Sequence, residues 1–263
     1  MNTFPIGIID SGLGGLSIWK EIVYQLPNES IVYIGDHRNL PYSNKKISQI
    51  RKYVEKLIHY LILHDVKLIV IACNTATVAG IEWYRKKFPS VPIIGVVPVV
   101  KTASEISKSK RFMVLSTSFT ARSTYQKKLI QTYAADCKVY SMGIGNLVSA
   151  IESGDSGSLK IRKLLEKKIL PVLHKGIDVI VLGCTHFPFV VQSIRDIVGE
   201  DIVIVDSGSA VARHVKRILH SRNELSFVDN PSNNFFTTGD KDLVSRVATI
   251  LLQKNIIFTH VTL

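Results

Sequence analysis

Two short segments of the chain carry a cysteine in the same sequence context. Cys73 lies in residues 71–76 (Ile-Ala-Cys-Asn-Thr-Ala) and Cys184 in residues 182–188 (Leu-Gly-Cys-Thr-His-Phe-Pro). Each cysteine follows an apolar run of strand length and precedes polar residues and a helix-like segment. A thiolate is a base as well as a nucleophile, and the dipole at a helix N-terminus favours the thiolate. A matched pair predicts that one thiolate removes a proton from a carbon while the opposite thiol returns one to the other face.

This two-base racemisation sets a distance between the sulfur atoms. A substrate carbon held between them, at a contact of about 3 to 3.5 Å from each, places the sulfurs about 6 to 7 Å apart. A disulfide, with its sulfurs at about 2 Å, would abolish the activity.

The residues around the cysteines suit an amino-acid substrate. Four hydroxyl or amide side chains could hold a carboxylate: those of Ser11, Asn74, Thr75 and Thr185. Backbone amides at turns and helix starts could hold it as well. Asp10 could take an ammonium group or orient a proton-transfer partner. His186 could polarise the Cys184 thiol or accept its proton.

The elements that position these residues alternate between strand and helix. We expect strands at 3–9, 30–35, 66–72, 92–97, 111–115, 139–142, 179–182, 202–205, 234–238 and 256–261, and the main helices from 16 and at 47–61, 123–130, 159–174, 210–219 and 241–252. Such alternation implies mainly parallel sheets with right-handed crossovers. We predict two similar α/β domains, 1–97 with 209–263 and 98–208, with the active site in the cleft between them.

Composition narrows the class of protein. The 263 residues are 46% hydrophobic and carry a formal charge of +12. The basic residues are spread over helix-like segments without interleaved aromatics, which favours a solvated basic surface over a nucleic-acid site. No apolar run reaches the roughly 18 residues of a membrane span, and the N-terminus lacks a signal-peptide pattern. We expect a cytoplasmic protein whose three cysteines remain thiols.

Four motifs resemble those of glutamate racemases, members of the aspartate/glutamate racemase family. They are residues 10–15 (Asp-Ser-Gly-Leu-Gly-Gly), Pro41-Tyr42, residues 72–76 and residues 183–188, in the family's order within a resemblance that runs from about residue 5 to 220. The resemblance implies an enzyme that interconverts L- and D-glutamate for peptidoglycan synthesis with no cofactor and no metal. It also implies pseudo-symmetric domains and a homodimer.

The resemblance assigns roles to individual residues. Cys73 would act on D-glutamate and Cys184 on L-glutamate, assisted by Asp10, Glu152 and His186. The substrate contacts that it implies are Asp10, Ser11, Pro41, Tyr42, Ser43, Cys73, Asn74, Thr75, Thr117, Thr120, Cys184, Thr185 and His186. Two departures stand out: Ser43 occupies a position that is usually Gly, and residues 142–145 (Met-Gly-Ile-Gly) replace a Cys-Pro-containing stretch, which leaves the geometry around Glu152 open.

Other functions are open from the residues alone. Gly12 and Gly14, with Asp36 at the end of the next strand, imitate a dinucleotide-binding fingerprint, although a nicotinamide-dependent oxidoreductase leaves both cysteine motifs unexplained. Zinc could be held by Cys73, Cys184 and His186, but their spacing matches no common structural site. A basic module that binds nucleic acid or a topoisomerase is a third hypothesis. The preference for glutamate over aspartate comes from the resemblance alone.

Overall fold

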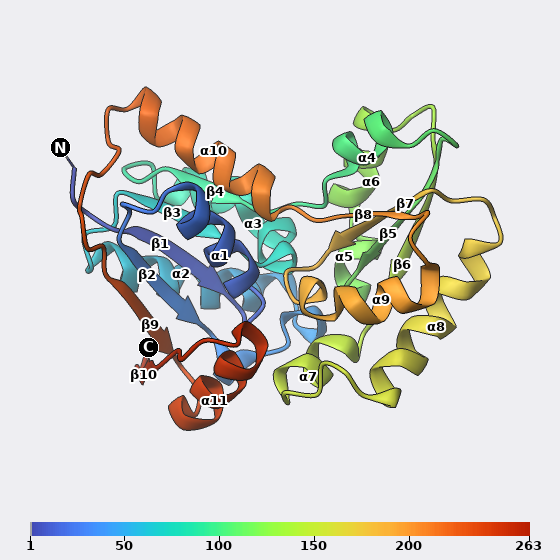
Figure 1. Ribbon diagram of the computed structural model, residues 1–263. Helices are drawn as coiled ribbons and strands as arrows, with labels where there is room; N and C mark the ends of the chain where they lie inside the picture. The colour runs from blue at the N-terminus through green and yellow to red at the C-terminus, as the bar shows by residue number, and fades with distance from the viewer. Residues whose placement is uncertain (1) are drawn as a thin grey trace. The chain divides into compact units, whose positions relative to one another are not determined.

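The computed structural model describes residues 2–263, which form two compact units, each with its own parallel sheet (Figure 1). One unit contains the residues up to Val96 together with Gly208–Leu263, and the other contains Val97–Ser207. The prediction of two mainly parallel sheets is confirmed. Among the described residues, no helix combines the length and the apolar character needed to cross a bilayer.

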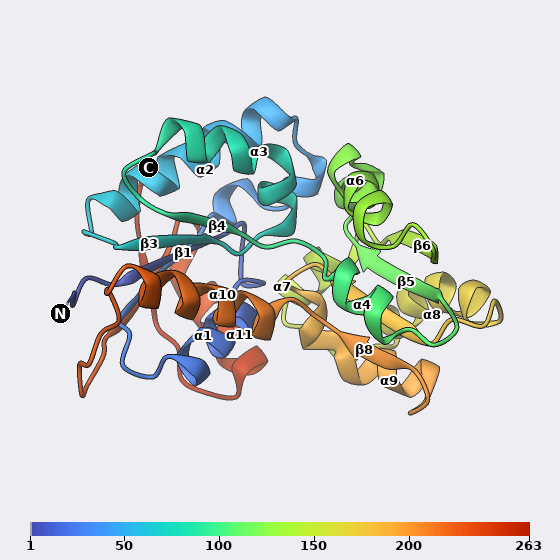
Figure 2. The ribbon, with the colours of Figure 1, turned by 90° about the horizontal axis from the view of Figure 1, so that it is seen from above.

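The first unit is built on a six-stranded sheet in the order β10-β9-β2-β1-β3-β4. Its strands are β1 (Ile6–Asp10), β2 (Ile31–Gly35), β3 (Leu68–Ile71), β4 (Ile93–Gly95), β9 (Asn233–Thr237) and β10 (Phe258–His260). Its helices are α1 (Leu16–Gln25), α2 (Ile47–Ile62), α3 (Asn74–Lys87), α10 (Gly208–Ser221) and α11 (Lys241–Leu252), with the 3₁₀ turns η1 (His37–Asn39) and η2 (Tyr42–Asn44). Helices α2 and α3 cover one face of this sheet, and α1, α10 and α11 cover the other (Figure 2). Because both faces are covered, β1, β2 and β3 are buried throughout and read as continuous apolar runs.

The second unit has a four-stranded sheet in the order β6-β5-β7-β8. Its strands are β5 (Arg111–Ser116), β6 (Lys138–Gly143), β7 (Val179–Gly183) and β8 (Val203–Val205). Its helices are α4 (Val100–Ile106), α5 (Ser118–Arg122), α6 (Thr124–Tyr133), α7 (Leu147–Glu152), α8 (Leu159–Leu173) and α9 (Val191–Val198), with the 3₁₀ turn η3 (Phe187–Val190). Buried side chains of α4, β5 and β7 form one core cluster, against which residues of α6 pack.

The two sheets share one connectivity. Counted from the start of each unit, the first four strands lie in the order second, first, third, fourth in both sheets. Cys73 follows the third strand of its sheet and Cys184 follows the third strand of the other. In sheets of this order, ligands bind at the carboxyl ends of the strands, at the switch point between the first and third strands. The repeated connectivity therefore puts one cysteine beside a switch point in each unit.

A buried ion pair anchors the returning chain in the first unit. Lys67 Nζ lies 2.6 Å from Glu29 Oε2, and both side chains are 1% exposed. Lys67 also donates to the carbonyl of Glu224 at 2.7 Å, while Glu29 Oε1 accepts the backbone N–H of Ser226 at 2.9 Å. Lys67 and Glu29 thus bond backbone groups of the segment that joins α10 to β9, and these bonds hold the segment beside the sheet.

Candidate active site

Cys73 lies at the start of α3 in the first unit, and Ala72 separates it from the carboxyl end of β3. It is the N-cap of that helix and is buried, with 6% exposure. The hydroxyl oxygen of Ser11 lies 3.6 Å from the Cys73 sulfur, a contact in which either atom could donate. Because the N–H groups of the first helical turn point toward this end, a thiolate here is stabilised by the helix.

Asp10 ends β1, next to the strand that delivers Cys73. The carboxylate is fully buried, and its Oδ1 accepts the backbone N–H of Gly12 at 2.8 Å. A Cβ atom on Gly15 would lie 2.8 Å from the Asp10 Cβ and 3.0 Å from the hydroxyl of Tyr33. Only glycine therefore lets this turn pack against the Asp10 side chain.

Asn74 and Thr75 form the first turn of α3, and both are buried. The Asn74 amide nitrogen donates to the carbonyl of Val96 at 3.2 Å, which orients the side chain. Its oxygen, Oδ1, has no hydrogen-bond partner among residues 2–263. A buried acceptor without a donor is costly, so it suits a ligand group that carries N–H or O–H.

The loop after β2 places Tyr42 in the same unit. The Tyr42 hydroxyl is buried and donates to Asp36 Oδ2 at 2.7 Å, and turn η2 packs against α3. Burial raises the pKa of Tyr42 well above its ordinary value, with further contributions from Asp36 and Cys73. Pro41, which follows a cis peptide bond, and Ser43 flank Tyr42 and are half-buried.

Asp36 belongs to the candidate site through its contact with Tyr42, whereas the sequence patterns pointed to it only in the dinucleotide alternative. Besides Tyr42, its carboxylate accepts the amide of Asn39, with both oxygens at 3.0 Å, and the hydroxyl of Thr238 at 2.8 Å. The carboxylate is therefore occupied by donors of the protein and is not free to hold a ribose. Its place at the carboxyl end of a parallel strand was the signal in the sequence that could have identified it.

The second unit holds a chain of three groups that begins at the other cysteine. Cys184 Sγ lies 3.9 Å from His186 Nδ1, and His186 Nε2 lies 2.6 Å from Glu152 Oε1. Cys184 is 5% and His186 2% exposed. Glu152, the last residue of α7, reaches His186 because α7 packs against η3. The departure at residues 142–145 leaves this contact intact.

The protonation of His186 follows from these contacts. Burial lowers the pKa of the imidazole, but the hydrogen bonds to Cys184 and Glu152 outweigh burial and raise it well above 6.5. An imidazolium donates at both nitrogens, to a carboxylate on one side and to a sulfur on the other. The arrangement can hold a positive charge beside the sulfur or shuttle a proton to and from it.

Cys184 differs from Cys73 in its local structure, which corrects the expectation that both cysteines lie at helix N-termini. Cys184 and Thr185 occupy a turn after β7, and the residue that caps the following 3₁₀ turn is His186. Pro188 near the start of η3 lacks the N–H of an ordinary first helical turn. Helix-dipole stabilisation therefore applies to Cys73, whereas Cys184 has a histidine and a carboxylate instead.

Three buried threonines join the candidate residues of the second unit. Thr117 follows β5 and is the N-cap of α5, where its hydroxyl oxygen accepts the backbone N–H of Thr120 at 3.2 Å. Its hydroxyl also donates to the Thr120 hydroxyl at 3.1 Å. Thr117, Thr120 and Thr185 are all buried. The predicted site residues thus gather at the carboxyl end of the sheet in each unit.

The three cysteines are thiols rather than disulfides; Cys73 and Cys184 are buried and Cys137 is half-buried. Within residues 2–263, no group of three or more His, Cys, Asp or Glu side chains is arranged to hold a metal ion.

Several named proteins are similar to this chain in sequence, in fold or in both. Glutamate racemases of Pseudomonas paraeruginosa and Stutzerimonas stutzeri are 36% and 37% identical to the chain, covering 94% and 95% of it and 93% and 95% of their own lengths. The crystal structure of a glutamate racemase isoform from Bacillus anthracis matches with a TM-score of 0.92 and 31% identity, covering 100% of this chain and 99% of that one. The Francisella tularensis glutamate racemase, solved in complex with D-glutamate, matches with a TM-score of 0.87 and 28% identity, over 100% and 98% of the two chains.

The family model described as Asp/Glu/Hydantoin racemase matches residues 6–215, which include every candidate site residue. This match and the close relatives confirm the resemblance seen in the motifs. The chain belongs to the Asp/Glu/Hydantoin racemase family.

Proposed function

We propose that this protein interconverts L- and D-glutamate by two-base proton transfer at the α-carbon. The observation that carries the proposal is the matched placement of two buried thiols, each after the third strand of its own sheet. The glutamate racemases that match over more than nine-tenths of the chain support the choice of substrate. The D-glutamate would serve peptidoglycan synthesis in the cytoplasm.

In the L-to-D direction, the Cys184 thiolate takes the α-proton of L-glutamate, and the electron pair of the broken C–H bond stays on the substrate as a carbanion. The Cys73 thiol then gives its proton to the opposite face of the carbon, which yields D-glutamate and a Cys73 thiolate. The reverse reaction exchanges the two roles. No cofactor enters this scheme, because the thiols supply both transfers and the substrate retains its electrons.

The polar partners fit this scheme. In the proposed roles, His186 and Glu152 assist Cys184, and Asp10 assists Cys73. The unpartnered Asn74 oxygen accepts a hydrogen of the substrate ammonium group, which is the polar group it lacks in the protein. The remaining predicted substrate contacts with hydroxyl groups are Ser11, Tyr42, Ser43, Thr75, Thr117, Thr120 and Thr185.

The decisive experiment follows each glutamate enantiomer in D₂O by NMR and by chiral chromatography. In a two-base reaction, deuterium appears at the α-carbon of the product before it appears in the remaining substrate, because a different thiol delivers the new hydrogen. Equal early labelling of both pools would indicate a single base and would refute the proposal.

The variants Cys73→Ala and Cys184→Ala test the two roles, with Cys137→Ala as the matched control. We expect the Cys73 and Cys184 variants to lose racemisation and the control to retain it, because Cys137 is half-buried and belongs to the candidate residues of neither unit. A Cys73→Ala or Cys184→Ala enzyme that racemises at the parental rate would contradict the assignment.

Aspartate is the alternative substrate within the family, and the same assay run with its enantiomers decides between the two. A higher kcat/KM for aspartate would overturn the choice of glutamate.

The proposal also includes the domain division, in which the two units act as domains. It further includes a homodimer, and light scattering of the purified chain would test that oligomeric state.

A further inference from the structure

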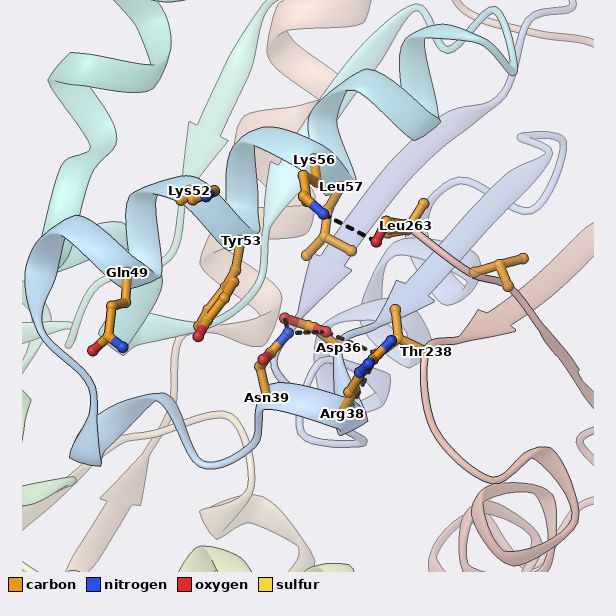
Figure 3. Close-up of a pocket in the computed structure, with 11 residues that line it drawn as sticks. Asp36, Arg38, Asn39, Gln49, Lys52, Tyr53, Lys56, Leu57, Thr238 and Leu263 are labelled. Carbon is orange, nitrogen blue, oxygen red and sulfur yellow. Dashed lines mark hydrogen bonds between the residues drawn. The ribbon is translucent and has the colours of Figure 1, made fainter.

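Strand β9 lies beside β2 and meets residues 36–43, the Tyr42 loop. The two strands pair in parallel, with Gly35 opposite Thr237. The residues that follow, Asp36 and Thr238, therefore leave the carboxyl ends of neighbouring strands side by side. Figure 3 shows Thr238 next to Asp36, at the start of the Tyr42 loop.

The hydroxyl of Thr238 bonds the Tyr42 loop twice. It donates to Asp36 Oδ1 at 2.8 Å and accepts the backbone N–H of Arg38 at 3.1 Å. The backbone N–H of Thr238 donates to the carbonyl of Gly35 at 3.1 Å, which fixes the residue to the end of β2. Thr238 is 8% and Asp36 2% exposed, so water competes little for the bond between them.

The residues on either side of Thr238 contact the same loop. Thr237 Oγ1 lies 2.8 Å from His37 Nδ1. A Cβ atom on Gly239 would lie 2.7 Å from the His37 Cβ, so glycine allows a close approach that a larger residue would prevent. Three consecutive residues after the second unit's return to the first thus determine where the start of the Tyr42 loop lies.

The Asp36 carboxylate connects this anchorage to Tyr42. Asn39 donates to both Asp36 oxygens at 3.0 Å and Tyr42 donates to Oδ2 at 2.7 Å. Both donors belong to the Tyr42 loop, so their bonds hold the loop together without fixing it to the sheet. Thr238 is a donor from a separate strand. A carboxylate bonded by the sheet at one oxygen and by Tyr42 at the other has one preferred orientation.

We propose that Thr238 is a positioning residue of the candidate site and orients Tyr42 toward the substrate through Asp36. This role rests on the proposed function, in which Tyr42 contacts glutamate. Without the Thr238 hydroxyl, the Asp36 carboxylate turns more freely and the Tyr42 hydroxyl loses its fixed acceptor. Thr238 lies outside residues 6–215, which the family model matches, and none of the cysteine or glycine motifs includes it.

Steady-state kinetics of the full chain test the role in Thr238→Val, because valine keeps the shape of threonine and lacks the hydroxyl. We expect the KM for glutamate to rise about 3- to 10-fold while kcat stays within about twofold of the parent, because a substrate contact weakens in the ground state and the transition state alike. Thr238→Ala repeats the loss with a smaller side chain, so a folding defect in one variant leaves the other to decide. Thr238→Ser restores the hydroxyl and should return the KM to the parental value.

An NMR signal of Tyr42 tests the same role without turnover. In protein labelled with ¹³C at the ζ-carbon of tyrosine, the resonance that is absent from Tyr42→Phe belongs to Tyr42. The ζ-carbon carries the hydroxyl and reports its hydrogen bond. We expect this resonance to move in Thr238→Val and to keep its parental position in Thr238→Ser.

The matched control is Thr249→Val, which removes another threonine hydroxyl from the same part of the chain. That hydroxyl belongs to α11 and accepts the backbone N–H of Ile256 at 3.2 Å. We expect the control to unfold at a lower urea concentration than the parent, with the parental KM and the parental Tyr42 resonance.

A KM and a Tyr42 resonance that stay parental in both Thr238→Val and Thr238→Ala overturn the role. A serine variant that behaves like the valine variant, or a control with the same rise in KM, also overturns it, since general destabilisation would then explain the change. A resonance that moves while the KM stays parental overturns the link to substrate binding. If the chain fails to racemise glutamate, the resonance still decides whether Thr238 positions Tyr42, so the two failures are distinguishable.

Discussion

Replacing Glu152 by Gln tests the buried chain from Cys184 through His186 to Glu152. The substitution keeps the shape of the side chain and removes its charge, at a contact of 2.6 Å between atoms of side chains that are 3% and 10% exposed. A charge-assisted hydrogen bond contributes about 1.5 to 3 kcal/mol and a neutral one about 0.5 to 1.5 kcal/mol. If the substitution lowers the stabilisation of the transition state by that difference of about 1 to 2 kcal/mol, kcat/KM falls about 5- to 30-fold.

The fall in kcat/KM must be the same in both directions, because enantiomers have equal free energies and the equilibrium constant is therefore one. The asymmetry appears in the kinetic isotope effects. With α-deuterated L-glutamate, the isotope effect on kcat/KM should rise in Glu152→Gln, because proton transfer at Cys184 becomes slower than the other steps. With α-deuterated D-glutamate, whose proton is taken by Cys73, the rise should be smaller.

Glu152→Gln should also change how the stability of the protein depends on pH. The folded-state pKa of His186 is raised, so the stability that its protonation contributes is fully present below pH 6.5 and is lost as the pH rises through the raised pKa. Without the Glu152 charge this pKa falls, so the loss occurs at lower pH. Urea unfolding across a pH series measures the shift, and NMR of the imidazole reports the titration.

The control is Glu166→Gln, which removes a carboxylate that is 32% exposed and lies 2.9 Å from Arg162 in the same unit. We expect unchanged kinetics, because ion pairs that water reaches contribute little and this one lies on α8, away from the candidate residues of the second unit. If Glu152→Gln matches the parent in kcat/KM, isotope effects and imidazole titration, Glu152 does not assist Cys184 through His186.

Three further substitutions test the first unit. Gly15→Ala should abolish most racemase activity, since its Cβ would lie 2.8 Å from the Asp10 Cβ and push that carboxylate away; activity equal to the parent would show that the turn adapts. Tyr42→Phe leaves the Asp36 carboxylate without one of its donors, and we expect unfolding in urea to become easier by about 1 to 3 kcal/mol, together with a higher KM. Lys67→Met strands the buried carboxylate that it pairs with at 2.6 Å, and thermal and urea unfolding should report a loss of about 3 to 5 kcal/mol, whereas a neutral outcome would mean that water reaches the site.

Much of the fold was predictable from local patterns. Apolar runs and helical periodicity placed strands such as β2 and helices such as α2 and α11 within a few residues of their observed bounds. These patterns are readable because the pleat of a strand and the turn of a helix repeat over a few residues, whatever the rest of the chain does. The cysteine motifs were equally local, so the two thiols and their neighbours were found together.

The partners of those thiols were decided by tertiary structure. The Ser11 contact with Cys73 joins residues 62 apart, the contact between Glu152 and His186 joins residues 34 apart, and the bond from Thr238 to Asp36 spans 202 residues. Such contacts depend on strand order and on how loops close, which no short pattern records. The turn at Cys184 shows the same limit, because its apolar context predicted a helix start where the chain forms a turn before η3. Sequence alone determined which groups could move a proton; the packing of separate segments decided which group each thiol contacts, because a side-chain contact requires both segments to be fixed in space.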